Sequence, residues 1–185
     1  KGDIRNGWFL WLAHPKISFG YDTTGGDYFF TNPMKMNQNL HQRYRALDLI
    51  SKVGCALLEG DDKGIVFNNK GAIVIHPGST DEKRAWPLKH WIDLIAHLSN
   101  RAKIVIVDIK DSKELIDQVK DLNVETFKGT LVEFKSWLAN QKCLVSPDSM
   151  AGHLAAYLNI PVITLFGSQP PDLTSPITKR GIVIK

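Results

Sequence analysis

CLVSPDSMAGHLAAYL, residues 143–158, is the stretch that decides the fold, because an apolar run leads directly into a segment with helical spacing. The run from Cys143 to Val145 is short and is followed by small and turn-forming residues, which is typical of a strand. Met150, Leu154 and Tyr157 then recur at the spacing of one helix face. The stretch therefore predicts a β-strand, a tight connection and an α-helix.

The same unit recurs on both sides of this stretch. We expect five strands, at Ala72 to Ile75, Lys103 to Val107, Val124 to Phe127, Cys143 to Val145, and Pro161 to Phe166. Helical stripes lie between them, at 88–98 with Pro87 in the first turn, and at 115–122, 131–138 and 150–157. Strands that are apolar throughout are typical of a parallel sheet covered on both faces. The predicted fold class is α/β, a Rossmann-like doubly wound parallel sheet that binds ligands at the carboxyl ends of its strands.

The first 65 residues have a different pattern. A glycine-rich and aromatic stretch from Ser18 to Phe30 precedes a polar turn at 31–37 and a predicted helix from Gln38 to Val53. Strand–helix alternation is absent from this segment, which is also short for a domain. We therefore expect residues 1–65 to be the tail of a preceding domain and residues 66–185 to form one domain.

Composition narrows the class of partner. The chain is 43% apolar and 23% charged, as in ordinary soluble globular proteins. Its net charge of +4 and pI of about 9.0 suit an anionic partner, but the basic residues are scattered and favour no nucleic acid. Cys55 and Cys143 each lie in an apolar stretch, so we expect buried, reduced thiols and a cytoplasmic location. No apolar run approaches the roughly 20 residues that span a bilayer.

The loop after the first expected strand has the composition of an anion cradle. It reads His76-Pro77-Gly78-Ser79-Thr80, and Lys83 and Arg84 follow before the next helix. The glycine allows close backbone approach, the two hydroxyl residues offer hydrogen bonds, and either cation can bind a phosphate oxygen. The alternative is an ordinary solvated loop between a strand and a helix.

Two further loops follow strands at the same expected edge. Ser146 to His153 runs from a strand into a helix start, where free N–H groups favour a phosphate. Asp148 would cap this helix and Gly152 would let it pack close to the sheet, which is the alternative to ligand binding. Phe166 to Pro171 forms a rigid turn. The histidines and cysteines show no zinc-ligand spacing, and no Asp-x-Asp pair suggests a divalent cation.

Taken in order, these loops resemble glycosyltransferase family 9, the lipopolysaccharide heptosyltransferase family. The C-terminal domain of that family reads H-P-G-[ST]-[ST], a basic residue before W-P, D-[ST]-G-x-x-H-L-A and L-F-G. The corresponding stretches of this chain are His76 to Thr80, Arg84 to Pro87, Asp148 to Ala155, and Leu165 to Gly167. Trp8 to Gly20 and Leu40 to Ile50 resemble the end of the family's N-terminal domain, so the resemblance spans nearly the whole chain.

The resemblance implies the C-terminal half of a GT-B glycosyltransferase. Such an enzyme binds an ADP-activated heptose in this domain, binds a lipid-linked saccharide acceptor in the other domain, and inverts the anomeric carbon. It requires no cofactor, and it works at the inner face of the inner membrane, where a basic protein can contact anionic lipid peripherally. The acidic catalytic base of the family lies in a glycine-rich loop that Lys1 to Gly7 do not match, so we expect the base upstream of this chain.

The resemblance also assigns roles to individual positions. Ser79 and Thr80 look like the donor-phosphate hydroxyl pair, and Arg84, with Lys83 as the alternative, looks like the cation beside the leaving diphosphate. The helix-start amides would belong to Ser149, Met150 and Gly152, the fixed acidic and imidazole positions to Asp148 and His153, and the loop beside the adenine to Lys128, Gly129 and Thr130.

Two departures from the family pattern bear on the donor. Met150 stands where the family has glycine, and Ala85 separates Arg84 from Trp86, which leaves the choice of basic residue open. Two other functions compete with sugar transfer. One is a non-catalytic or truncated nucleotide-binding module of the same fold. The other is a dehydrogenase, which is disfavoured because no G-x-G-x-x-G follows any strand.

Overall fold

The computed structural model describes residues 4–23, 27–54, 71–79 and 81–185. The chain divides between Asp61 and Asp62 into two compact units, and each is described by itself below. The domain boundary predicted at residues 65 and 66 lies outside the described residues, as do Cys55 and Thr80.

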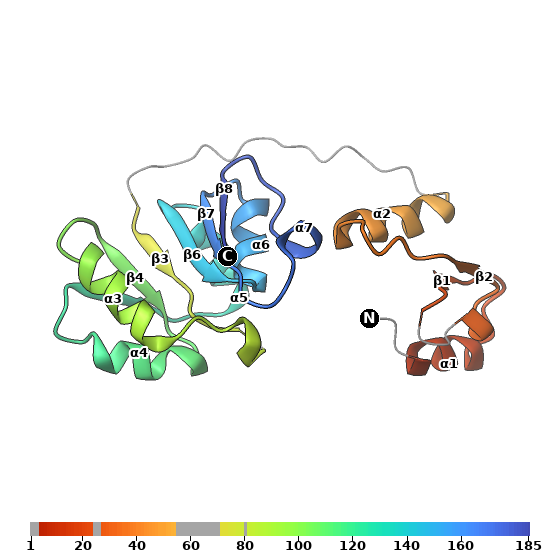
Figure 1. Cartoon of the computed structure of the whole chain (residues 1–185), viewed down its shortest axis with the longest axis horizontal. Helices are drawn as coiled ribbons and strands as arrows, with labels where there is room; N and C mark the ends of the chain where they lie inside the picture. The colour runs from red at the N-terminus through yellow and green to blue at the C-terminus, as the bar shows by residue number, and fades with distance from the viewer. Residues whose placement is uncertain (1–3, 24–26, 55–70, 80) are drawn as a thin grey trace. The chain divides into compact units, whose positions relative to one another are not determined.

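The second unit is built on one parallel sheet of six strands in the order β5-β4-β3-β6-β7-β8 (Figure 1). The strands are β3 (Ile73–Ile75), β4 (Ile104–Val107), β5 (Val124–Phe127), β6 (Cys143–Pro147), β7 (Val162–Leu165) and β8 (Gly181–Ile184). Every neighbouring pair is parallel. The expected strands are confirmed, and β8 is an additional edge strand. The strand order is that of a doubly wound nucleotide-binding fold.

Helices connect these strands at the positions that the apolar stripes predict. They are α3 (Leu88–Leu98), α4 (Lys113–Gln118), α5 (Leu131–Leu138), α6 (Met150–Tyr157) and the short α7 (Pro171–Thr174), with 3-10 turns η2 (Glu82–Arg84) and η3 (Lys110–Ser112). Pro87 is the N-cap residue of α3, one position before the first turn in which it was expected. The helix α4 ends one residue before Val119, which is still fully buried.

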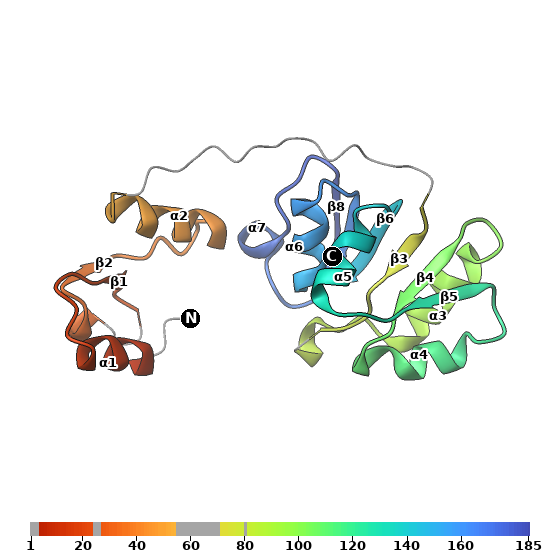
Figure 2. The same ribbon diagram turned by 180° about the vertical axis from the view of Figure 1, so that it is seen from behind.

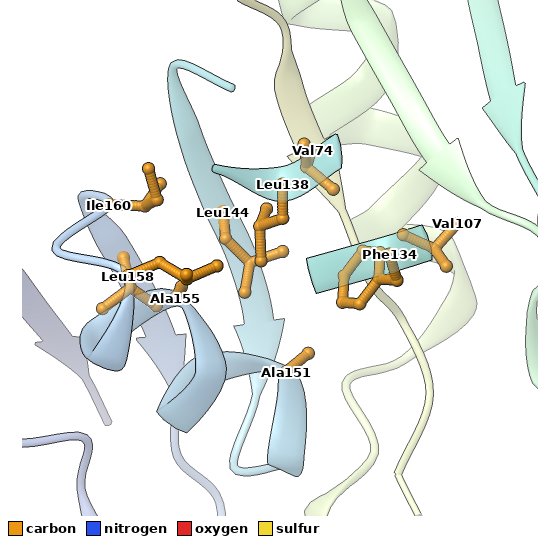
Figure 3. Packing of buried hydrophobic residues seen from close by; sticks show 10 residues of the cluster. Val74, Val107, Phe134, Leu138, Leu144, Ala151, Ala155, Leu158 and Ile160 are labelled. Atoms are coloured by element: carbon orange, nitrogen blue, oxygen red, sulfur yellow. The ribbon is translucent and has the colours of Figure 1, made fainter. Parts of the chain in front are cut away.

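Two cores cover the two faces of the sheet. Adjacent residues of a strand point to opposite faces, so Val74 packs with α5 and α6 through residues such as Phe134, Leu138 and Ala155 (Figure 3), whereas Ile75 packs with Trp91 and other residues of α3 and α4. Figures 1 and 2 show the sheet between these helix pairs. The predicted arrangement of helices on both faces is confirmed.

The first unit consists of α1 (Ile4–Leu12), β1 (Phe19–Tyr21), η1 (Asp27–Phe29), β2 (Asn32–Met34) and α2 (Gln42–Lys52). The two short strands pair in parallel. Ser18 and Thr31, the residues just before the two strands, hold the strand starts together. The backbone N–H of each donates to the hydroxyl of the other, at 2.8 and 2.9 Å. The hydroxyl of Tyr21 donates to the carbonyl of Arg45 at 2.6 Å and so holds α2 against β1.

The helix predicted from Gln38 begins later, at Gln42. Arg45 explains the difference, because its guanidinium donates to the carbonyls of Leu40 at 2.7 Å and Gln38 at 2.6 Å and holds that segment in a turn. The Nδ1 atom of His41 then caps the helix by accepting from Arg43 N–H. The prediction was therefore wrong at the start of α2.

Two further observations concern the expectations from composition. The thiol of Cys143 is free, and it is half-buried where a buried thiol was expected; burial raises its pKa. Within the described parts of the chain, no helix is long and apolar enough to cross a membrane.

Candidate binding site at the strand switch point

The order of the strands reverses between β3 and β6, which are neighbours in the sheet although β4 and β5 separate them in the chain. Register pairs Ile75 with Val145, so the carboxyl ends of the two strands lie side by side. A reversal of this kind opens a crevice at the carboxyl edge of a parallel sheet, where ligands bind. Of the loops singled out in the sequence, the two after β3 and β6 begin side by side at this edge of the sheet.

The loop after β3 packs closely against the loop after β4. Pro77 and Gly78 are buried. A Cβ atom on Gly78 would overlap Cδ1 of Ile109 and would lie 3.5 Å from Oδ2 of Asp111, so only glycine fits without a shift of its neighbours. The hydroxyl of Ser79 is engaged in the turn that follows, because it donates to the carbonyl of Asp81 at 3.1 Å.

The predicted basic pair lies in the 3-10 turn η2, where its two members have different surroundings. Asp81 caps the turn by accepting from Lys83 N–H at 3.0 Å. The side chain of Lys83 is exposed. Arg84 is half-buried, and its Nη1 atom reaches the loop after β6, lying 3.2 Å from the carbonyl oxygen and 3.6 Å from Oδ2 of Asp148. The structure therefore joins Arg84, and not Lys83, to the second predicted loop.

Asp148 does not cap the helix that follows it, so that prediction was wrong. The N-cap of α6 is Ser149, in extended conformation. Backbone hydrogen bonding to β7 continues one residue past the end of β6: Asp148 N–H donates to the carbonyl of Leu165 at 3.2 Å, which holds Asp148 beside β7 before the helix begins. Its carboxylate is buried against Arg84.

The start of α6 presents groups that suit an anion. Ser149 makes no side-chain capping bond, so the first amides of the helix lack a side-chain cap there. The hydroxyls of Ser146 and Ser149 are both buried and have no hydrogen-bond partner among the described residues. A buried hydroxyl without a partner costs roughly 1–3 kcal/mol, which a bound oxygen would offset. The positive end of the helix dipole favours an anion at this position.

Three other predicted residues of this segment have distinct environments. The side chain of Met150 is 55% exposed at the first position of α6. A Cβ atom on Gly152 would lie 3.2 Å from Cγ of Pro176 and 3.4 Å from Oγ of Ser146, so this glycine lets α6 pack close to the sheet. His153 is exposed. The structure thus brings Met150 to the helix start and places Gly152 in a packing contact.

Lys128, Gly129 and Thr130 lie beyond β5, two strands from the switch point, and all three are exposed. Thr130 forms a capping box with Glu133: the hydroxyl of Thr130 donates to Oε2 of Glu133 at 2.8 Å, and Glu133 N–H donates to that hydroxyl at 3.3 Å. The immediate role of Thr130 is therefore to begin α5.

Aromatic rings connect this loop to the first one. Phe134 lies between His76 and Phe127, at centroid distances of 6.1 and 5.8 Å, and Phe127 stacks on Trp137 at 4.2 Å. Burial lowers the pKa of His76, although a backbone hydrogen bond and the charge of Asp111 act in the opposite direction. The imidazole is therefore neutral near pH 7.

Sequence reasoning assigned no role to Asp111 or to the imidazole of His76. Asp111 lies beside Gly78 because η3 turns back toward the first loop, held by Ser112, whose hydroxyl donates to Ile109 carbonyl and accepts from Ile109 N–H, both at 2.9 Å. The position of Asp111 after the second strand could have marked it as a ligand residue in the sequence, because an acidic residue there binds ribose in dinucleotide folds. Among the described residues, no group of His, Cys, Asp and Glu side chains could hold a metal ion.

Comparison with known proteins identifies a family and a fold. The family model described as glycosyltransferase family 9 (heptosyltransferase) matches residues 15–185. Lipopolysaccharide heptosyltransferase 2 of Escherichia coli strain K12 is 28% identical over 112 residues, which are 55% of this chain and 32% of the relative. The chain therefore spans about a third of the length of this curated relative.

Solved structures share the fold. The E. coli heptosyltransferase WaaC with ADP-2-deoxy-2-fluoro heptose has a TM-score of 0.74 at 20% identity and is matched over 99% of this chain and 63% of its own. The glycosyl transferase family 9 structure from Veillonella parvula DSM 2008 has a TM-score of 0.76 at 14% identity, over 100% of this chain and 60% of its own. At these identities the likeness concerns the fold, and it confirms the predicted α/β class.

Proposed function

Because the chain belongs to glycosyltransferase family 9, the heptosyltransferase family, we propose that its second unit binds a nucleoside diphosphate sugar and that the protein transfers the sugar to a saccharide acceptor. In its specific form the donor is ADP-heptose or a related ADP-sugar, the acceptor is a lipid-linked lipopolysaccharide core, and the anomeric carbon is inverted. The ligand named with the E. coli WaaC structure supports an adenosine diphosphate donor.

The observation that carries this proposal is the contact between Arg84 and the carbonyl of Asp148, one residue before the N-cap of α6. A guanidinium matches phosphate oxygens with paired N–H donors, and a helix start carries partial positive charge. The contact brings these two features together at the crevice between β3 and β6. Such a combination suits a diphosphate.

The surroundings of each side chain support specific roles in donor binding. Arg84 would bind the diphosphate, and not Lys83, whose side chain is exposed. The hydroxyl and amides at the start of α6 would bind a phosphate oxygen, and Met150 would contact the sugar. Asp111 would bind a ribose hydroxyl, because it follows the second strand of the sheet and lies beside Gly78.

The remaining sequence assignments carry less structural support. Thr80 as a phosphate ligand rests on sequence alone, and the hydroxyl of Ser79 is already bonded within its turn. Gly152 lets α6 pack close to the sheet. The side chain of His153 is exposed, so it would contact the donor at the protein surface. The loop of Lys128, Gly129 and Thr130 would border the adenine across the aromatic cluster of Phe127 and Phe134.

The proposed reaction is a single displacement. The oxygen of an acceptor hydroxyl attacks the anomeric carbon, the bond between that carbon and the diphosphate oxygen breaks, and its electron pair leaves with the diphosphate. A base takes the proton of the attacking hydroxyl. Arg84 and the start of α6 stabilise the negative charge that grows on the departing oxygen, which lowers the barrier.

A lipid-linked acceptor would place the protein on the cytoplasmic face of a membrane. The net charge of +4 supports peripheral contact with anionic lipid. The intact protein should co-sediment with phosphatidylglycerol vesicles at low salt and stay in the supernatant at high salt. It should not co-sediment with phosphatidylcholine vesicles. Equal retention by both vesicles would contradict this location.

Donor binding can be tested by thermal unfolding of the intact protein with ADP, GDP and UDP. ADP at about a hundred times its Kd should raise the free energy of unfolding by about 2.7 kcal/mol. Arg84→Ala should remove most of this stabilisation, whereas Lys83→Ala, a matched change of the neighbouring cation, should leave most of it. The absence of any shift with all three nucleotides would refute the donor site.

Transfer requires a separate test. The intact protein should release ADP from ADP-heptose only when a lipopolysaccharide-core acceptor is added, and the product should have the anomeric configuration opposite to that of the donor. Donor binding without transfer, in the presence of a competent acceptor, would favour the non-catalytic nucleotide-binding module.

A further inference from the structure

The loop after β7 contacts the turn that carries Arg84. A Cβ atom on Gly167 would lie 3.0 Å from the backbone carbonyl oxygen of Lys83, and the hydroxyl of Ser168 donates to the same oxygen at 3.4 Å. Pairing within the sheet anchors the start of this loop, because Phe166 N–H donates to the carbonyl of Ile184 at 2.7 Å. A loop fixed to β7 and β8 thus touches one backbone atom of η2.

The identity of that atom matters for the binding site. The carbonyl of Lys83 belongs to the same planar peptide group as the N and Cα atoms of Arg84. A displacement of the carbonyl therefore tilts the whole group and swings the arginine side chain. On the other side of this peptide group, Arg84 N–H donates to the carbonyl of Asp81 at 2.9 Å, so both ends of the group are held.

The arginine is consequently fixed at two levels. Its guanidinium contacts Asp148 just after β6, and the peptide group that joins it to Lys83 contacts Gly167 and Ser168, just after β7, through the Lys83 carbonyl oxygen. Loss of the second restraint would leave the ion pair possible but would change the direction from which the side chain approaches the crevice. This matters for a cation that must meet phosphate oxygens within hydrogen-bonding distance.

We propose that Gly167 and Ser168 are positioning residues for Arg84, which set the orientation of its guanidinium toward the diphosphate of the donor. This inference rests on the proposed donor site. Glycine at 167 is required for space and not for backbone conformation, because Gly54 is the only glycine of the described residues with a positive φ angle. An alanine at 167 therefore tests the contact with Lys83 without straining the φ angle of residue 167 itself.

The intact protein provides the test, with the affinities for ADP and AMP measured by titration calorimetry. Gly167→Ala should weaken ADP binding by about threefold to tenfold, and Ser168→Ala by about twofold, within the range of coupling between neighbouring residues. AMP binding should change less than ADP binding, because the effect acts through the cation beside the second phosphate. The melting temperature without nucleotide should stay unchanged.

Two comparisons separate positioning from general damage. In an Arg84→Ala background, Gly167→Ala should have no further effect on ADP affinity, since the residue through which it acts is gone. Gly181→Ala, at the amino end of the neighbouring strand β8 and so away from the carboxyl end of β7, should leave ADP affinity unchanged in either background. An ADP loss that persists in the Arg84→Ala background, or an equal loss for AMP, would overturn the inference.

The outcomes also distinguish this inference from the function on which it rests. If the wild-type protein binds no nucleoside diphosphate, the donor site itself is wrong and the positioning role falls with it. If the wild-type protein binds ADP and Gly167→Ala binds it equally well, only the positioning role is wrong.

Discussion

The Nη1 atom of Arg84 lies 3.2 Å from the carbonyl oxygen of Asp148 and 3.6 Å from its Oδ2 atom. Arg84 follows β3 and Asp148 follows β6, so one side chain joins the ends of two strands that are far apart in the chain. The carboxylate is buried, and the guanidinium is partly exposed. This asymmetry suits an arginine that the protein holds on one side and that is open to solvent on the other.

Asp148→Ala should destabilise the protein by about 1–3 kcal/mol, because the half-buried guanidinium would lose a charged partner. Urea unfolding of the variant measures the change. Asp172→Ala provides the matched control, since it removes an exposed aspartate from α7 and should change stability by less than about 0.5 kcal/mol. Equal stability of the two variants would show that the contact with Arg84 does not contribute to the fold.

Much of the second unit could be predicted from sequence because its strands and helices have clear periods. The apolar runs predicted β3 to β7 to within about two residues, which is the usual precision at element ends. The edge strand β8 escaped prediction for a physical reason. Its residues Ile182, Val183 and Ile184 are 59%, 43% and 51% exposed, and only the four-residue α7 precedes it, so no alternating pattern marks it.

The loops of the site were predictable, but their contacts were not. Periodicity identifies a strand without giving its place in the sheet, and the meeting of Arg84 with Asp148 depends on β6 lying next to β3. The same limit explains the wrong helix cap, because Asp148 N–H donates to the carbonyl of Leu165, and the neighbouring position of β7 is not given by periodicity. Similarly, α1 was missed because its apolar residues surround the helix and form no stripe, as the exposed Trp8 and Phe9 illustrate.

Gly78→Ala should destabilise the protein by about 1–3 kcal/mol, because the added methyl group overlaps Cδ1 of Ile109 in a buried loop. Ile109→Val removes that Cδ1 atom, so the double variant should regain much of the lost stability. Urea unfolding of the two single variants and the double variant gives the coupling between them. Additive losses would mean that the overlap with Ile109 is not the cause.

His76 should make stability depend on pH. Burial holds its folded-state pKa below the ordinary value of 6.5, so the unfolded chain binds more protons in the window between the two pKa values. Stability is therefore fully present above pH 6.5 and is lost as the pH falls from there toward the folded-state pKa.

The measurement is the free energy of unfolding from about pH 8 to about pH 5. A His76→Asn variant should lose less stability over this range than the wild type, although it starts lower because the imidazole packs against Phe134. The exposed His97 of α3 provides the control, and His97→Asn should retain the wild-type pH dependence. Parallel curves for wild type and His76→Asn would contradict the role given to burial.

Thr130→Ala should cost about 1 kcal/mol of stability, because it removes the hydroxyl that caps α5. Thr130→Ser keeps that hydroxyl and should retain the cap. The pair also separates capping from donor binding. If Thr130 acts only through the capping box, the serine variant should bind ADP as the wild type does. The alanine variant should also bind ADP normally at temperatures well below its melting point. Calorimetric ADP titrations beside urea unfolding check both properties. Full stability of Thr130→Ser with a clear loss of ADP affinity would instead show that the methyl group of Thr130 contacts the nucleotide, as the proposed place of this loop beside the adenine would require.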